Sequence, residues 1–225
     1  KARQPFSPVT GMAPILNSPL QRSGPGQAGP PDDRRVEKRM RHAQSQALHA
    51  YWQTRRQGGA APHRTDIEPQ DIARMLGYVF ILWRADPDHH IFRLAGTHLC
   101  DLYQREFRDQ NFLSLWRSHD RTHVQAVLEA SITGTEPASL IARPVTMGRL
   151  DLPVEISFLP LRGPSGAIDR TLGLFQPLGD AAALRGRPAV RTVLQEVHPP
   201  LQRDKLYAGL FGDAGTAPRK VANDQ

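Results

Sequence analysis

The residues of this sequence that are best suited to chemistry are three histidines in its central part. His119 and His123 lie four positions apart at the start of a helix-forming stretch, so both imidazoles share one helical face, as metal ligands often do. No third or fourth ligand accompanies them at a suitable spacing, and we therefore expect a solvated or helix-capping role and no metal site. His98 follows a strand-forming stretch and could bind haem, although such a histidine more often hydrogen-bonds to adjacent backbone.

Other reactive side chains lack the partners that catalysis requires. The sequence shows no paired carboxylates, nucleophile elbow or Gly-rich phosphate loop, so we expect no catalytic residues and no enzyme. The single cysteine, Cys100, excludes an internal disulfide and stands in an apolar stretch, where a buried structural thiol is the usual role. Arg93 and Glu155 belong to different predicted strands, and we expect an ion pair across the sheet, with a contact to a polar ligand as the alternative.

The positive charge of the chain is concentrated at its N-terminal end. The net charge is +7, and residues 1–57 carry 10 Lys or Arg against 3 Asp or Glu, whereas residues 58–178 carry 12 against 14. We do not expect nucleic acid to be a partner, because no aromatic residues are interleaved with the arginines and no helix-turn-helix pair is evident. We favour a solvated helix face, with a nucleic-acid-associated regulator as an alternative. No stretch approaches the roughly 20 apolar residues of a membrane span, which predicts a cytoplasmic protein.

The elements that must position these residues begin after a Pro- and Gly-rich segment, residues 1–31, which we expect to be disordered. Residues 32–59 predict a basic amphipathic helix over 34–57, with apolar residues three and four positions apart and a stop at Gly58-Gly59. Its C-terminal half should dock on the domain. Its bulky end, formed by Leu48, Tyr51 and Trp52, predicts an interface for a homodimer or for an unidentified regulatory protein.

Residues 60–178 predict one folded domain. Strand-forming runs on either side of Asp86-Pro87-Asp88-His89 indicate a hairpin over 78–97, and its first strand is apolar enough to be covered on both faces. Short helical pieces and a longer helix over 120–132 follow, and then strands at 138–146, 152–158 and 171–178. This order predicts an α+β fold, a five-stranded antiparallel sheet with helices on one face. Residues 179–225 should be mostly irregular, with an edge strand at 190–197.

The ordered set of elements resembles a PAS domain, and more narrowly the proteobacterial single-PAS family without a fused output domain. The matching pieces are Asp66-Ile67 with Pro69 and Ile72, Phe92-Arg93-Leu94-Ala95-Gly96-Thr97, Arg105-Glu106 followed by Phe112-Leu113-Ser114-Leu115-Trp116, Leu159-Pro160-Leu161, and Leu172-Gly173. Gln104 and Asp109 stand where such sequences tend to have Gly in turns. The Cys-containing flavin-attachment motif of light-sensing relatives and a convincing haem ligand are both missing. The resemblance implies sensing or protein–protein interaction, without naming a ligand.

A set of apolar residues could line a pocket between the sheet and the helices, although such a set more often forms only the core. Its members are Phe80, Leu82, Phe92, Leu94, Leu102, Tyr103, Phe112, Trp116, Ile156 and Phe158. We expect a PAS-type sensory and protein-interaction module of bacterial regulation, without catalysis and without a cofactor. The other alternative is a sensor that holds haem or a small apolar ligand in this pocket.

Overall fold

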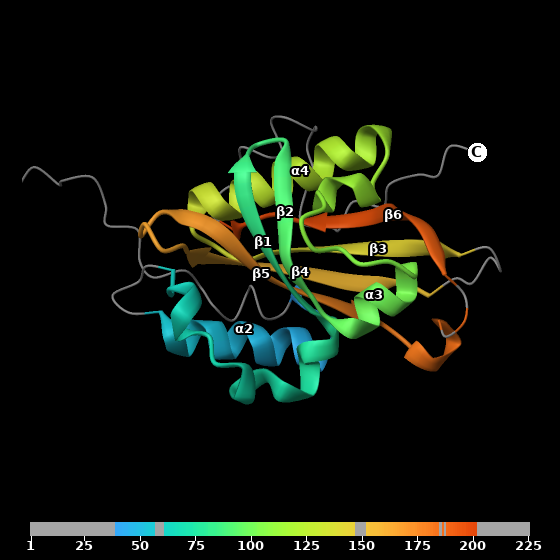
Figure 1. Cartoon of the computed structure of the whole chain (residues 1–225), viewed down its shortest axis with the longest axis horizontal. Coiled ribbons are helices and arrows are strands. Elements are labelled where there is room, and N and C mark those ends of the chain that lie inside the picture. Colours follow the sequence, from blue (N-terminus) through green and yellow to red (C-terminus); the bar gives the residue numbers. More distant parts are fainter. Residues whose placement is uncertain (1–38, 57–60, 147–151, 185, 187, 202–225) are drawn as a thin grey trace, which may run out of the picture.

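The computed structural model of the chain describes residues 39–56, 61–146, 152–184, 186 and 188–201 (Figure 1). Six strands form one antiparallel sheet in the order β2-β1-β5-β4-β3-β6. The strands are β1 (Val79–Asp86), β2 (His89–Ala95), β3 (Ala138–Thr146), β4 (Val154–Arg162), β5 (Ile168–Pro177) and β6 (Ala189–His198). Within the described residues the helices are α2 (Ala43–Arg55), α3 (Thr97–Tyr103) and α4 (Ser118–Gly134), with 3₁₀ turns η1 (Arg64–Asp66), η2 (Pro69–Tyr78), η3 (Phe112–Leu115) and η4 (Ala181–Leu184). The predicted α+β class is confirmed.

All five predicted strands form. The sixth strand, β6, corresponds to the edge strand predicted at residues 190–197. β6 pairs with β3 from Ser139, opposite His198, to Thr146, opposite Ala189. It is also tied to the helical layer, because the Tyr103 hydroxyl on α3 is hydrogen-bonded to the Thr192 hydroxyl. The backbone N–H of Leu194 donates to an Asp120 carboxylate oxygen on α4 at 3.0 Å. The sheet is therefore six-stranded, and its last strand is anchored to two helices.

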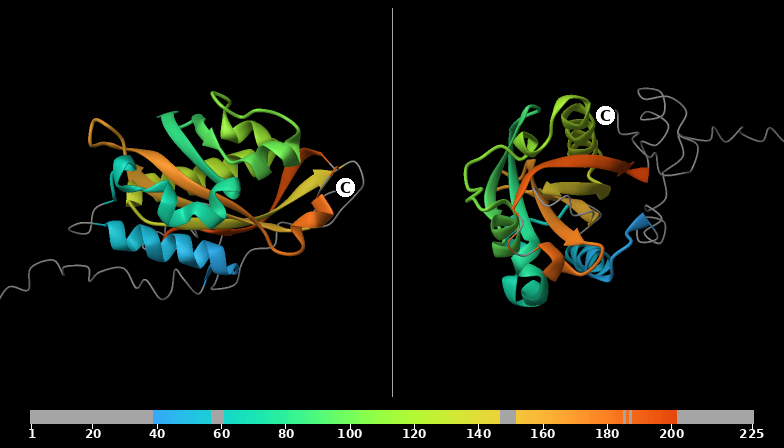
Figure 2. Two further views of the ribbon diagram at one scale, coloured as in Figure 1. Left: turned by 60° about the horizontal axis from the view of Figure 1, so that its bottom comes forward. Right: turned by 90° about the vertical axis from the view of Figure 1, so that its right-hand side faces the viewer.

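Both faces of the sheet are covered, which explains why β1 is apolar at successive positions (Figure 2). Phe80 and Leu82 point to the face under α3, η3 and α4, and we call the buried cluster there the inner core. Val79 and Ile81 point to the opposite face, and we call the cluster under α2 and η2 the outer core. Since side chains alternate between faces along a strand, one strand serves both cores.

Helix α2 lies on the sheet face opposite α4 (Figure 2). Leu48 and Trp52 are fully buried there, and the Trp52 Nε1–H donates to the Pro160 carbonyl at 2.8 Å. The docking of this helix on the domain is thus as predicted, but the predicted continuous helix over 34–57 is wrong at residues 40–42, which are not helical. His42 is the extended N-cap of α2, and its Nδ1 accepts the Gln44 N–H. Residues 34–38 and 57 lie outside the described residues.

Two turns have residues other than Gly at positions of positive φ. Gln104, which ends α3, has φ 50°, and Asp109 has φ 62°. Both lie in the left-handed region, where residues other than Gly are strained and Asp is better tolerated than most. The absence of Gly at these turns therefore carries a conformational cost in the segment between α3 and η3.

Candidate functional site

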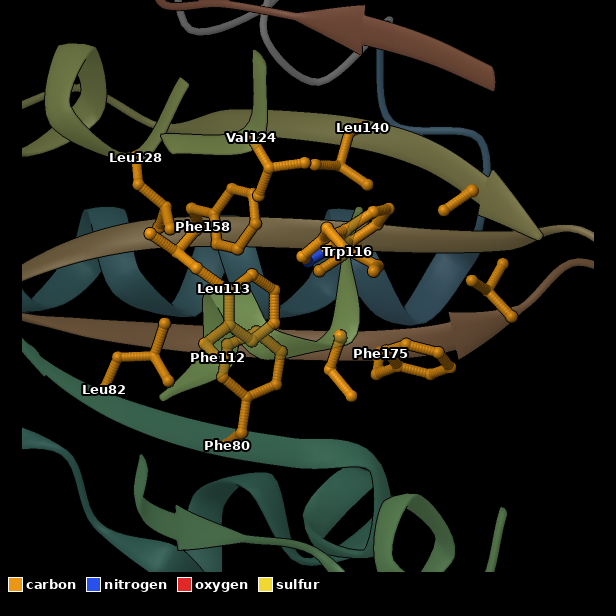
Figure 3. Packing of buried hydrophobic residues seen from close by; sticks show 14 of the residues in the cluster. Phe80, Leu82, Phe112, Leu113, Trp116, Val124, Leu128, Leu140, Phe158 and Phe175 are labelled. Carbon is orange, nitrogen blue, oxygen red and sulfur yellow. The ribbon is translucent and has the colours of Figure 1, made fainter. Parts of the chain in front are cut away.

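Aromatic rings pack against one another in the inner core (Figure 3). The ring centroids of Phe80 and Phe112 are 5.4 Å apart, and those of Phe112 and Phe158 are 5.8 Å apart. These separations are those of direct ring contacts. Gly173 on β5 makes room for one ring, because a Cβ there would lie 2.0 Å from Phe80 Cζ. The rings therefore occupy the space between the strands and η3.

Nine of the ten predicted pocket residues belong to this inner core. They are Phe80, Leu82, Phe92, Leu102, Tyr103, Phe112, Trp116, Ile156 and Phe158. The tenth, Leu94, is 40% exposed, so its assignment to the pocket is wrong. The cause is an irregularity in the hairpin: Leu82 pairs with Phe92, but Ile81 pairs with Leu94, which turns Leu94 to the opposite face.

Trp116 carries a polar atom that packing in the inner core does not explain. The residue is only 3% exposed, and its Nε1–H has no hydrogen-bond partner within the described part of the chain. Figure 3 shows the indole nitrogen inside the cluster. A buried unpaired donor costs about 1–3 kcal/mol. A small molecule or water with an acceptor oxygen at this point would remove that cost.

A charged group joins the β1–β2 hairpin to α4. The Arg84 guanidinium donates to both carboxylate oxygens of Glu129, each at 2.7 Å. The fully buried ring of His90 brings its Nε2 within 3.1 Å of the same carboxylate. Burial raises the pKa of Glu129, but the contacts with His90 and Arg84 lower it more, to about 2. Sequence reasoning missed this group, although Arg84 and His90 interrupt the inward-facing series of their strands.

The predicted ion pair between Arg93 and Glu155 is wrong. Arg93 donates to an Asp109 carboxylate oxygen at 2.9 Å on an exposed surface. Glu155 is fully buried on the outer face of β4. Its two oxygens accept the backbone N–H groups of Arg41, at 2.7 Å, and His42, at 3.0 Å. The carboxylate thus binds the chain just before α2.

The predicted partner interface is occupied by the chain itself. Leu48 and Trp52 are buried in the outer core and cannot meet a partner while α2 is docked, so their assignment to an interface is wrong. Tyr51 is half-buried, and its hydroxyl accepts the Glu68 N–H at 2.9 Å. The interface prediction failed because the outer face of the sheet covers the apolar side of α2, a role that we had expected a partner to have.

The described arginines of the basic segment also have partners within the chain. Arg55 pairs with Asp71, and the Arg56 guanidinium lies 4.8 Å from the centroid of the Trp52 ring. Arg39 and Arg41 contact the end of the sheet near β6. These contacts give the described arginines partners other than phosphate, but Arg39 and Arg41 contact the sheet and so differ from the solvated helix face that we expected. Arg34, Arg35 and Lys38 lie outside the described residues.

The histidines do not assemble a reactive centre in the described ranges. His98 is exposed and packs on the Tyr78 ring with centroids 4.4 Å apart, so the structure does not favour the haem-ligand alternative for this residue. His119 is exposed and His123 is half-buried. Among the residues that the structure describes, no three His, Cys, Asp or Glu side chains are placed to hold a metal ion. Burial raises the pKa of the half-buried Cys100 thiol.

Comparisons with solved structures return low-similarity matches. The light-state LOV domain of the blue-light photoreceptor Aureochrome1 is 16% identical, with a TM-score of 0.38, and the match covers 51% of this chain and 93% of that one. A LOV protein of Rhodobacter sphaeroides is 12% identical, with a TM-score of 0.38 and coverage of 53% and 73%. The Vibrio cholerae VqmA dimer gives 14% identity, a TM-score of 0.38, and coverage of 52% and 53%. No curated protein matches the chain.

Two further findings concern membrane spans and family membership. No helix in the described ranges is both long enough and apolar enough to cross a membrane. A family model described as "PAS domain" matches residues 40–176, from just before α2 to the end of β5, so β6 falls outside the match. Because this match covers more than half of the 225 residues, the chain belongs to the PAS domain family.

Proposed function

We propose that this PAS domain is a sensory and protein-interaction module of a regulatory pathway, and that it acts without catalysis. In this proposal a signal received in the inner core changes how the segment that carries α2 sits on the outer face. Partner proteins would then read the position of that segment. The predicted homodimer is one such assembly, although it would need a surface other than buried Leu48 and Trp52.

The observation that carries the proposal is the sharing of strands between the two cores. On β1, Phe80 belongs to the inner core and its neighbour Ile81 to the outer core. On β4, Phe158 belongs to the inner core and its neighbour Leu159 to the outer core. Packed interiors transmit displacement because they contain little free volume. A shift of either strand on one side must therefore be accommodated on the other.

Hydrogen exchange of the full chain tests this coupling. Phe158→Leu perturbs the inner core through β4, whereas the matched control Leu128→Ala perturbs the same core through α4. We expect amides of α2 (Ala43–Arg55) to exchange at least 5-fold faster in Phe158→Leu, and by more than the amides of β1. The control should change α2 and β1 alike. An equal change of α2 in both variants would contradict the proposal.

A second candidate function is the sensing of a small molecule inside the inner core, and the unpaired Trp116 Nε1–H favours it. The ligand would be largely apolar and would present one acceptor oxygen to the indole. Native mass spectrometry and an absorbance spectrum of the purified full chain test this idea directly. We expect an added mass that is lost in Trp116→Phe. A mass equal to that of the chain alone, with Trp116→Phe more stable than the wild type, would count against a ligand.

A further inference from the structure

The outer face of the sheet carries two adjacent rows of mostly polar side chains near α2. Strand pairing places Gln176, Glu155, Ile141 and Glu196 in one row, and Leu174, Ser157, Ser139 and His198 in the next. We call these eight residues the polar rows. Glu155 and Glu196 are buried, and burial lowers the pKa of His198, although the Glu196 carboxylate opposes this. Glu155 and Glu196 are the two carboxylates of the polar rows, and both contact the segment just before α2.

The segment formed by residues 39–42 lies against the polar rows and is held by polar contacts. Glu155 accepts two consecutive backbone N–H groups, from Arg41 and His42. The negative charge therefore sits at the N-terminus of α2, where the helix dipole favours it. Charge-assisted bonds of this kind are about twice as strong as neutral ones. The start of the helix is thus fixed by one residue that lies more than a hundred positions away.

The same segment also holds the last strand. The Arg41 guanidinium pairs with Glu196 on β6, and Arg39 Nη1 donates to the Pro199 carbonyl at 3.0 Å. Arg39 and Pro199, together with Met40 and Leu201, line a single small pocket. The chain before α2 and the chain after β6 are therefore joined at one place on the sheet.

The first turn of α2 is bound less well than the rest of the helix. Leu48 and Trp52 make apolar contacts in the outer core. By contrast, Ser45 Oγ in the first turn, and Ser157 Oγ and Gln176 Oε1 in the polar rows, are buried and have no hydrogen-bond partner among the described residues. Each unpaired buried group opposes burial. Elements with few apolar contacts open first, so this end of the helix should leave the sheet before the Trp52 end does.

We propose that residues 39–45 form a latch that the carboxylates of Glu155 and Glu196 hold closed. When the latch opens, the first turn of α2 leaves the sheet, the polar rows become accessible, and β6 loses its link to the N-terminal segment. The latch stands on the contacts above and does not require the function proposed for the domain. It assigns to Glu155 the role of a positioning residue for the start of α2.

Hydrogen exchange of the full chain with Glu155→Gln tests the latch. The new amide can accept one backbone N–H, but its NH₂ group faces the other, so one of the two bonds is lost. We expect the amides of residues 41–47 to exchange at least 10-fold faster, while those of β1 change less than 2-fold. The control Glu68→Gln alters an exposed carboxylate and should change the exchange rates of neither region. Unchanged exchange at residues 41–47, or an equal rise throughout the chain, would overturn the latch.

A second variant keeps the proposal testable if Glu155→Gln folds poorly. Glu196→Gln removes the charge that pairs with Arg41 and that lies 3.6 Å from His198 Nε2, at the edge of the polar rows. We expect trypsin to cleave after Arg41 at least 3-fold faster in this variant than in the wild type, because an open latch presents this bond to the protease. Equal cleavage rates in Glu196→Gln and the wild type would overturn the role of Glu196.

Discussion

Glu129 on α4 gives the sharpest test of the electrostatics in this domain. We expect Glu129→Gln to lower the free energy of unfolding by about 2 kcal/mol at pH 7. The carboxylate accepts two bonds from Arg84 and lies 3.1 Å from buried His90. The amide can keep one acceptor for Arg84, but it carries no negative charge to balance the Arg84 guanidinium.

The magnitude follows from the displaced titration. The pKa of Glu129 is about 2 in the folded chain, against 4.5 for the free side chain. The difference means that folding stabilises the ionised carboxylate over the protonated one by about 3 kcal/mol. The side chains of Arg84 and Glu129 are 31% and 23% exposed, so water weakens the interaction and we reduce the value to about 2 kcal/mol. For a domain of this size the change corresponds to a fall in Tm of about 6 °C.

The pH dependence of the effect has a definite sign. Because folding lowers the pKa of Glu129, the stabilisation is fully present above the unfolded value and is lost as the pH falls toward about 2. The difference between wild type and Glu129→Gln should therefore be constant above about pH 5 and should shrink below it.

Urea unfolding followed by circular dichroism at several pH values measures this difference. Asp109→Asn is the matched control, because its carboxylate pairs with Arg93 on an exposed surface and Asn tolerates the positive φ at this position. We expect the control to cost less than about 0.5 kcal/mol. A loss at Glu129 no larger than that at Asp109, or a gap that widens on acidification, would refute the reasoning.

Three further predictions concern a close contact, a strained turn and a buried hydrogen bond. Gly173→Ala should cost about 2–4 kcal/mol because its Cβ would lie 2.0 Å from the Phe80 ring, and Phe80→Leu in the same chain should restore part of the loss in urea unfolding. Gln104→Gly should raise stability by about 0.5–1 kcal/mol, since it relieves a φ of 50°; a lower Tm would contradict this. Trp52→Phe should cost about 1–2 kcal/mol by removing the hydrogen bond to the Pro160 carbonyl, and an unchanged Tm would count against that bond.

The strands and the docked helix could be predicted because their signals are local. The run from Val79 to Leu82 is apolar at each position, and only a strand covered on both faces uses such a run. The spacing of Leu48 and Trp52 likewise indicates a helix with one apolar face. The same spacing does not say whether that face meets the chain's own sheet or a partner, which depends on the area left uncovered by the fold.

The errors arise from contacts between residues far apart in the sequence. The helix begins at Ala43 because Glu155 takes the N–H groups of residues 41 and 42, and no helical pattern reveals that carboxylate. Leu94 left the predicted pocket because the pairing register shifts in the hairpin, whereas alternation assumes a regular strand. The predicted pair of Glu155 with Arg93 failed for a different reason, because charge alone does not show which face of a sheet a residue occupies.

A double-mutant cycle across the sheet tests the coupling of the two cores most directly. Phe158→Leu changes the inner core and Leu48→Ala the outer core, and the two side chains lie on opposite faces of β4. We expect the double variant to lose about 0.5–1 kcal/mol less than the two single losses combined, because each change already loosens the strand for the other. The pair Leu128→Ala and Leu48→Ala, which shares no strand, should be additive. Additivity of the first pair within about 0.3 kcal/mol would contradict the transmission of a signal through β4.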